Sequence, residues 1–131
     1  MATGRCLDSY ADLSAYGADV GGVAEFFPGR GPKVSISERI AAGERRGSRF
    51  RTTLTHEFGH VRFHKPLWAQ KFANGDLLQR DVNANKAVSK RDNILDASQA
   101  DWMEWQAGYI SGALLMPATP VCRLVSEYCS P

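Results

Sequence analysis

All three histidines of the chain lie within nine residues, and their spacing suits a metal ion. His56 and His60 enclose a His-Glu-x-x-His pentapeptide in which Glu57 directly follows the first imidazole. Residues four apart on a helix share one face, so both imidazoles could bind one zinc ion. Glu57 would lie about 100° around the helix from His56, where it could act as a general base on a water molecule. The alternative is two ordinary surface or core histidines on an amphipathic helix.

A catalytic zinc ion usually needs a third protein ligand and keeps one position for water. The extended pattern His-Glu-x-x-His-x-x-Gly-x-x-His does not apply, because Phe63 and Pro66 stand where it requires Gly and His. His64 would lie about 12 Å along a straight helix from His56, too far for one ion to bind both. We therefore expect His64 to support the site from nearby or to lie at the end of the helix. The third ligand should be a carboxylate from elsewhere in the chain.

Glu104 is the best candidate for that carboxylate. It borders an apolar stripe on a second predicted helix, residues 101–116, where a carboxylate near the core needs a partner. The residues of the stripe are Met103, Ala107, Ile110 and Leu114. Glu104 could equally be a residue of the first turn that closes a capping box with Asp101. Its position alone leaves both roles open.

The helix that carries the histidines is predicted over residues 49–64, with Pro66 ending it. Its apolar residues should face the core and leave the histidine face toward a cleft. These apolar residues are Phe50, Leu54, Phe58 and Val61.

The remaining segments predict a chain of mixed α and β structure. Two strand-like segments, 20–27 and 33–37, flank a loop rich in Pro and Gly, which predicts an antiparallel hairpin. Residues 8–16 have apolar side chains at every third position and predict a short helix. Residues 120–128 predict a short final helix. Between the two main helices, residues 67–97 give no clear pattern.

Composition indicates one ordinary globular domain over residues 1–131, with 44% hydrophobic and 23% charged residues. No apolar run approaches the ~20 residues of a membrane span, and the N-terminus lacks the apolar core of a signal peptide. The cysteines form no Cys-x-x-Cys pair, which argues against a disulfide framework and against a cysteine-built zinc site. They are Cys6, Cys122 and Cys129. We therefore expect a cytoplasmic protein with no membrane partner.

Charge is concentrated in the middle of the chain. Residues 30–51 carry seven basic and two acidic side chains, within a chain whose net charge is +2. Such a segment could guide an anionic partner, or it could be an ordinary solvated surface. No zinc finger, recognition helix or aromatic-basic platform accompanies the charge, so we do not expect direct binding of nucleic acid.

Two segments resemble motifs of the ImmA/IrrE-type zinc metallopeptidases. Residues 49–64 are similar to the active-site helix motif R-x-R-F-T-x-A-H-E-x-G-H-x-x-x-H. Residues 104–117 are similar to the second motif E-x-x-A-N-x-F-A-x-x-L-L-M-P. Among the departures of the chain from these motifs are Thr55, Gly108 and Ile110, where Ala, Asn and Phe are usual, and none of these three is a ligand or the base. The resemblance implies a zincin-like α+β fold, with a small antiparallel sheet packed on the active-site helix and on a second helix that bears a ligand.

The resemblance also implies a role for each site residue. Zn²⁺ would be held by His56, His60 and Glu104, and Glu57 would be the general base for peptide hydrolysis. The implied activity is that of a zinc-dependent endopeptidase that cleaves one specific protein. Its typical substrate is a helix-turn-helix transcriptional repressor encoded nearby, in a phage, mobile-element or stress-response setting. The alternative is a non-enzymatic, metal-binding regulatory protein that acts by binding a partner.

Overall fold

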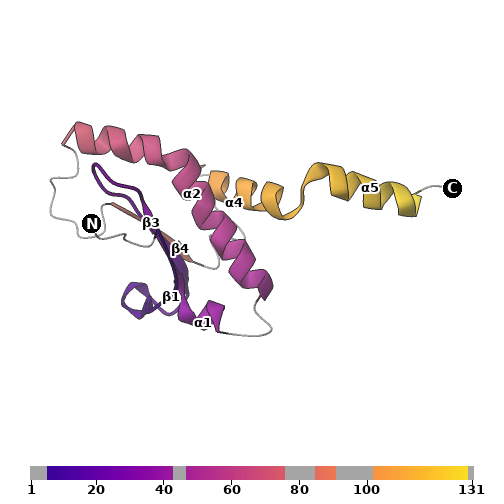
Figure 1. Ribbon diagram of the computed structural model, residues 1–131, viewed down its shortest axis with the longest axis horizontal. Helices are drawn as coiled ribbons and strands as arrows, with labels where there is room; N and C mark the ends of the chain where they lie inside the picture. The colour runs from indigo at the N-terminus through magenta and orange to yellow at the C-terminus, as the bar shows by residue number, and fades with distance from the viewer. Residues whose placement is uncertain (1–5, 43–46, 76–84, 91–101, 130–131) are drawn as a thin grey trace.

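The computed structural model describes residues 6–42, 47–75, 85–90 and 102–129. Its strands form one four-stranded sheet in the order β1-β3-β2-β4, and the helix α2 (Gly47–Ala73) packs along it (Figure 1). The fold is therefore α+β, as predicted. The sheet is mixed and not antiparallel as expected, because β1 (Leu7–Ala11) runs parallel to β3 (Lys33–Ser37).

The first described segment is a strand and not the predicted short helix. β1 lies at the edge of the sheet, where Leu7 is in register with Val34 of β3. Helical structure is limited to the 3-10 turn η1 (Ser14–Tyr16), which Gly17 follows with a φ of 130°. The three-residue spacing of apolar side chains was misleading because Leu13 enters a core cluster with β2 residues from outside any regular helix. Backbone pairing with β3 outweighs the local pattern.

The predicted antiparallel hairpin is confirmed. β2 (Val20–Glu25) pairs antiparallel with β3 on one side and with β4 (Lys86–Lys90) on the other. β2 is thus a central strand, and its side chains alternate between the two faces of the sheet. Ala24 belongs to the cluster that contacts α2, whereas Val23 packs in the cluster with Leu13.

The helix α2 does not end before Pro66 but continues through it to Ala73. A proline inside a helix removes one backbone hydrogen bond and bends the helix when packing holds both halves. Figure 1 shows this bend between the two halves of α2. The second half is held by Trp68, which is 8% exposed and stacks on Phe26 with the ring centroids 5.3 Å apart. Packing on the sheet therefore extends a helix that the local sequence signal would end.

The most buried residues of α2 are polar. Its three histidines and Glu57 are at most 1% exposed, while Phe58 is 48% exposed. Three residues of the predicted apolar stripe do pack against the sheet, namely Phe50, Leu54 and Val61. The prediction that Phe58 faces the core was wrong, because its side chain is exposed. The prediction that the histidines face a cleft was also wrong, because a second helix covers the histidine side of α2. That helix is α4 (Trp102–Leu115).

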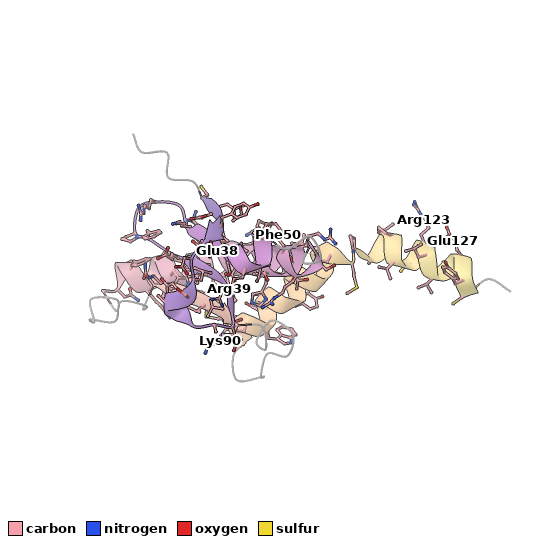
Figure 2. The ribbon with its side chains drawn as sticks, turned by 90° about the horizontal axis from the view of Figure 1, so that it is seen from below. Glu38, Arg39, Phe50, Lys90, Arg123 and Glu127 are labelled. Carbon is pink, nitrogen blue, oxygen red and sulfur yellow. The ribbon has the colours of Figure 1, made fainter. Side chains whose placement is uncertain are left out.

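The remaining helices are α1 (Glu38–Ala41), which is one turn long, and α5 (Ala118–Cys129), which confirms the final helix predicted at 120–128. α5 extends away from the sheet and from α2 (Figure 1). Arg123 and Glu127 lie on one side of it (Figure 2). Its apolar side chains are also exposed: Val121, Leu124, Val125 and Tyr128.

Asp101, the predicted cap of the second helix, lies outside the described residues. Across the described ranges, none of the helices combines the length and apolarity needed to cross a membrane.

Candidate metal centre

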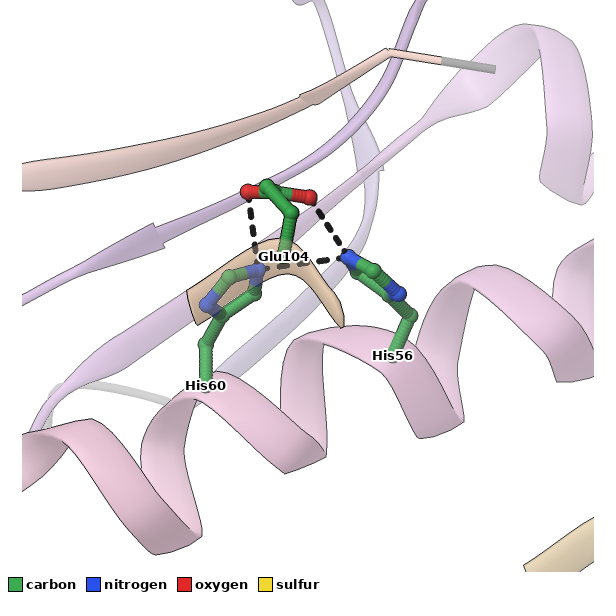
Figure 3. A group of neighbouring side chains, drawn as sticks. All are labelled: His56, His60 and Glu104. Atoms are coloured by element: carbon green, nitrogen blue, oxygen red, sulfur yellow. Dashed lines mark hydrogen bonds and ion pairs between the residues drawn. The ribbon is translucent and has the colours of Figure 1, made fainter. Parts of the chain in front are cut away.

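His56, His60 and Glu104 meet between α2 and α4 (Figure 3). Nε2 of His56 lies 3.0 Å from Oε2 of Glu104, and Nε2 of His60 lies 3.2 Å from its Oε1. The two Nε2 atoms are 3.2 Å apart. Ligand bonds of about 2.0–2.1 Å at tetrahedral angles would separate two ligand atoms by roughly 3.3 Å. This buried His-His-Glu group could therefore hold a metal ion with little rearrangement.

The charge state of Glu104 suits a metal ligand. Burial raises the pKa of this carboxyl group, but the hydrogen bonds from His56 and His60 outweigh burial and lower the pKa to about 2. Glu104 is thus a carboxylate at neutral pH, which is the form that coordinates metal ions. Of the two roles that its position in the sequence allowed, its contact with both imidazoles favours that of a ligand.

A glycine on α2 lets α4 approach closely enough for this contact. A methyl group added at Gly59 would lie 2.9 Å from Cα of Ala107 and 3.1 Å from its carbonyl oxygen. Both atoms belong to the backbone of α4 and cannot move aside as a flexible side chain could. Ala107 is 0% exposed and lies one turn after Glu104 on the same helix. The missing side chain at Gly59 therefore sets the spacing at which Glu104 reaches the histidines.

Hydroxyl groups also join the two helices. Oγ1 of Thr55 lies 2.7 Å from Oγ of Ser111, and the Ser111 hydroxyl also donates to the carbonyl oxygen of Thr52 at 3.2 Å. Thr55 is one of the positions at which the chain departs from the motif it resembles, where Ala is usual. The threonine at this position joins α2 to α4 through its hydrogen bond with Ser111, which an alanine could not form.

Glu57 lies against the sheet beside the site. A methyl group added at Gly22 of β2 would approach the Glu57 side chain to 2.5–2.8 Å, so only glycine leaves room for it. Glu57 is 0% exposed. Within the described residues, neither of its carboxylate oxygens has a well-formed hydrogen bond, not even from the nearby Ser89 hydroxyl. Burial raises the pKa of Glu57 to about 7, although the charge of His60 opposes the rise. A carboxyl group with this pKa can both accept and release a proton near neutral pH.

His64 does not lie at a helix end, because α2 continues past it. Its Nδ1 atom lies 2.9 Å from Nδ1 of His60, and its Nε2 atom lies 3.2 Å from Oε1 of Gln106 on α4. His64 thus contacts the ring nitrogen of His60 that points away from Glu104. This matches one of the two roles predicted for His64, that of a residue that supports the site from nearby.

Sequence reasoning identified none of Gly22, Gln106 or Ser111 as part of the site. Adjacent glycines inside a strand pattern can signal a close approach of another segment, and this signal was present at Gly22. Gln106 and Ser111 carry no such signal, because their contacts arise only when α4 packs on α2.

Comparison with known proteins adds nothing to this geometry. No protein-family model, curated protein sequence or solved structure matches the chain significantly.

Proposed function

We propose that the protein is a zinc-dependent endopeptidase with a zincin-like catalytic site. The observation that carries this proposal is the buried group of His56, His60 and Glu104, with the buried carboxyl group of Glu57 beside it. The pKa of Glu104 is lowered to about 2 and that of Glu57 is raised to about 7. Two carboxyl groups whose environments separate their pKa values are typical of an active site in which each has its own task.

The two tasks follow from the contacts. Glu104 completes the ligand set with His56 and His60, and a Zn²⁺ ion bound there would supply Lewis-acid activation of water and of a peptide carbonyl group. Glu57 contacts neither imidazole through a hydrogen bond and would accept a proton from the attacking water. The same carboxyl group would then pass this proton to the leaving amine.

We further propose that the substrate is one specific protein, such as a helix-turn-helix transcriptional repressor. Two observations support a narrow specificity. The candidate ligands are at most 7% exposed, so an arbitrary peptide in solution does not meet them directly. The two motifs also resemble those of peptidases with a single cognate substrate. Casein and other generic substrates should therefore be cleaved poorly, and rapid digestion of them would contradict this specificity.

The substitution Glu57→Gln tests the proposal. It should leave about one zinc ion per chain, because Glu57 is not a ligand, and should lower the rate of cleavage by about 100-fold or more. Zinc is measured by elemental analysis, and cleavage by electrophoresis of a repressor encoded beside the gene. Glu127→Gln, at an exposed position on α5, is the matched control and should change neither quantity. Loss of zinc from Glu57→Gln would show that Glu57 is a ligand and not the base.

The burial of the site also supports the second candidate function, a metal-binding regulator without catalytic activity. The two functions differ in how Glu57→Gln behaves. A regulator would bind its partner in a zinc-dependent manner, would leave that partner intact, and would be unaffected when Glu57 loses its ability to transfer a proton. Intact partner in the presence of zinc-loaded wild-type protein, recovered as a complex that chelator dissociates, would favour the regulator.

A further inference from the structure

A line of hydrogen bonds runs from a candidate ligand to an uncharged side chain on α4. His60 directs Nε2 toward Glu104 and His56, while its other ring nitrogen, Nδ1, lies 2.9 Å from Nδ1 of His64. His64 in turn places Nε2 3.2 Å from Oε1 of Gln106. Both histidines are at most 1% exposed, so the contact between them is buried, while Gln106 is half-buried at the end of the line.

The donors and acceptors along this line are fixed by Gln106. Its Oε1 atom has no proton and can only accept, so the Nε2 atom of His64 must donate. A neutral imidazole carries one proton, which leaves Nδ1 of His64 as an acceptor. When a metal ion binds, Nε2 of His60 exchanges its hydrogen bond to Glu104 for the metal ion, and Nδ1 of His60 must then donate to Nδ1 of His64.

The opposite orientation of the Gln106 amide would reverse every step. Its NH₂ group would donate to His64, His64 would donate from Nδ1, and the proton of His60 would be placed on Nε2. That tautomer cannot bind a metal ion through Nε2. The amide orientation on α4 therefore decides whether a ligand on α2 is ready to bind metal.

We infer that Gln106 is a positioning residue of the metal centre, which acts through His64 to hold the proton of metal-bound His60 on Nδ1. This inference rests on the proposed metal site but not on the proposed peptidase activity. Partners that fix the tautomer of a metal-binding histidine typically change metal affinity by about 10–100-fold.

A purely structural role has to be separated from this one, because the His64–Gln106 bond also joins α2 to α4. The chain offers a matched control in the Thr55–Ser111 link, which joins the same two helices and does not involve a histidine. Gln106→Leu removes the acceptor at nearly constant volume, and Thr55→Val removes a hydroxyl group in the same way. Both variants lose one bond between the helices, but only the first interrupts the line to His60.

The test compares zinc affinity, by competition with a chromogenic chelator, in the two variants. Gln106→Leu should bind zinc about tenfold more weakly than the wild type or worse, while Thr55→Val should stay within about twofold. The two hydrogen-bonded residues should act as a unit, so adding Gln106→Leu to His64→Leu should cause little further loss. Wild-type affinity in Gln106→Leu, an equal loss in Thr55→Val, or additive losses in the double variant would each overturn the inference.

Nitrogen-15 NMR of the histidine rings supplies a readout that is independent of activity. In wild-type protein, with or without zinc, His64 should carry its proton on Nε2, and in the zinc-loaded form His60 should carry its proton on Nδ1. Gln106→Leu should abolish the single tautomer of His64, whereas Thr55→Val should keep it. A proton on Nδ1 of His64 in the wild type would overturn the inference. A zinc-binding protein that cleaves nothing would contradict the peptidase and leave the inference intact.

Discussion

Glu104 is the one candidate ligand that α4 supplies. Its carboxylate contacts two buried imidazoles, and no other charged group of α4 takes part in the described ligand cluster. Glu104→Ala should therefore lower zinc affinity by more than about 100-fold, or about 3 kcal/mol, because a charged ligand is lost. His64→Ala, which removes only a partner of a ligand, should lower it by about tenfold and leave the zinc content intact at saturating metal.

Both variants are measured by competition with a chromogenic chelator, and circular dichroism checks that each is folded. Glu127→Ala, which removes an exposed carboxylate from α5, is the control for a general effect of charge. A zinc-replete Glu104→Ala beside a metal-free His64→Ala would show that His64 is the ligand and that Glu104 only caps its helix.

The predictability of the site differs from residue to residue, and sequence distance explains the difference. His56, Glu57 and His60 could be predicted together because helical geometry alone brings residues four apart onto one face. Glu104 is 48 residues from His56 and was assigned as a ligand only through a motif resemblance. Gln106 could not be predicted at all, because an uncharged side chain acquires this contact only from the packing of two helices.

At the scale of the elements, Gly59 of α2 lies directly against the backbone of α4 at Ala107. Gly59→Ala should destabilise the fold by about 1–3 kcal/mol, because the new methyl group overlaps the backbone at Ala107. The same substitution at Gly112, on α4, meets no atom within 4 Å and should stabilise the protein by up to about 1 kcal/mol through helix propensity. Urea denaturation of both variants measures the free energy of unfolding.

The two substitutions are chemically identical and both lie inside a helix, so their difference isolates the overlap. Zinc affinity should fall in Gly59→Ala, since α4 must move away and take Glu104 with it, and should be unchanged in Gly112→Ala. Equal stability of the two variants would show that the helices can separate at no cost and that Gly59 does not set their spacing.

The elements themselves were predicted well where a pattern is local and poorly where packing decides. The hairpin followed from strand-like segments around a loop of Pro and Gly, and α4 followed from its apolar stripe. The end of α2 was missed because stacking of Trp68 on Phe26 holds the helix beyond Pro66. β1 was missed because its structure depends on pairing with β3, which lies more than twenty residues further along the chain.

At the scale of the whole molecule, the α+β class was predictable and the arrangement of the sheet was not. The polar face of α2 is covered from two directions. The four-stranded sheet lies on one side of it and α4 lies on the other. A helical pattern of apolar residues identifies only one buried face. It could not show that the second buried face would be the one with the histidines, because burial of these polar side chains depends on their bonds to one another and to α4.

The extended position of α5 has a consequence for the dimensions of the protein in solution. A compact chain of 131 residues has a radius of gyration of roughly 14 Å. α5 adds a rod of roughly 18 Å beyond α4, so small-angle X-ray scattering should give a larger radius and a pair-distance distribution with a long tail (Figure 1). A variant that ends at Pro117 should lose the tail and approach the compact value. A tail-free distribution for the full chain would instead place α5 back against the body, with its apolar side chains covered.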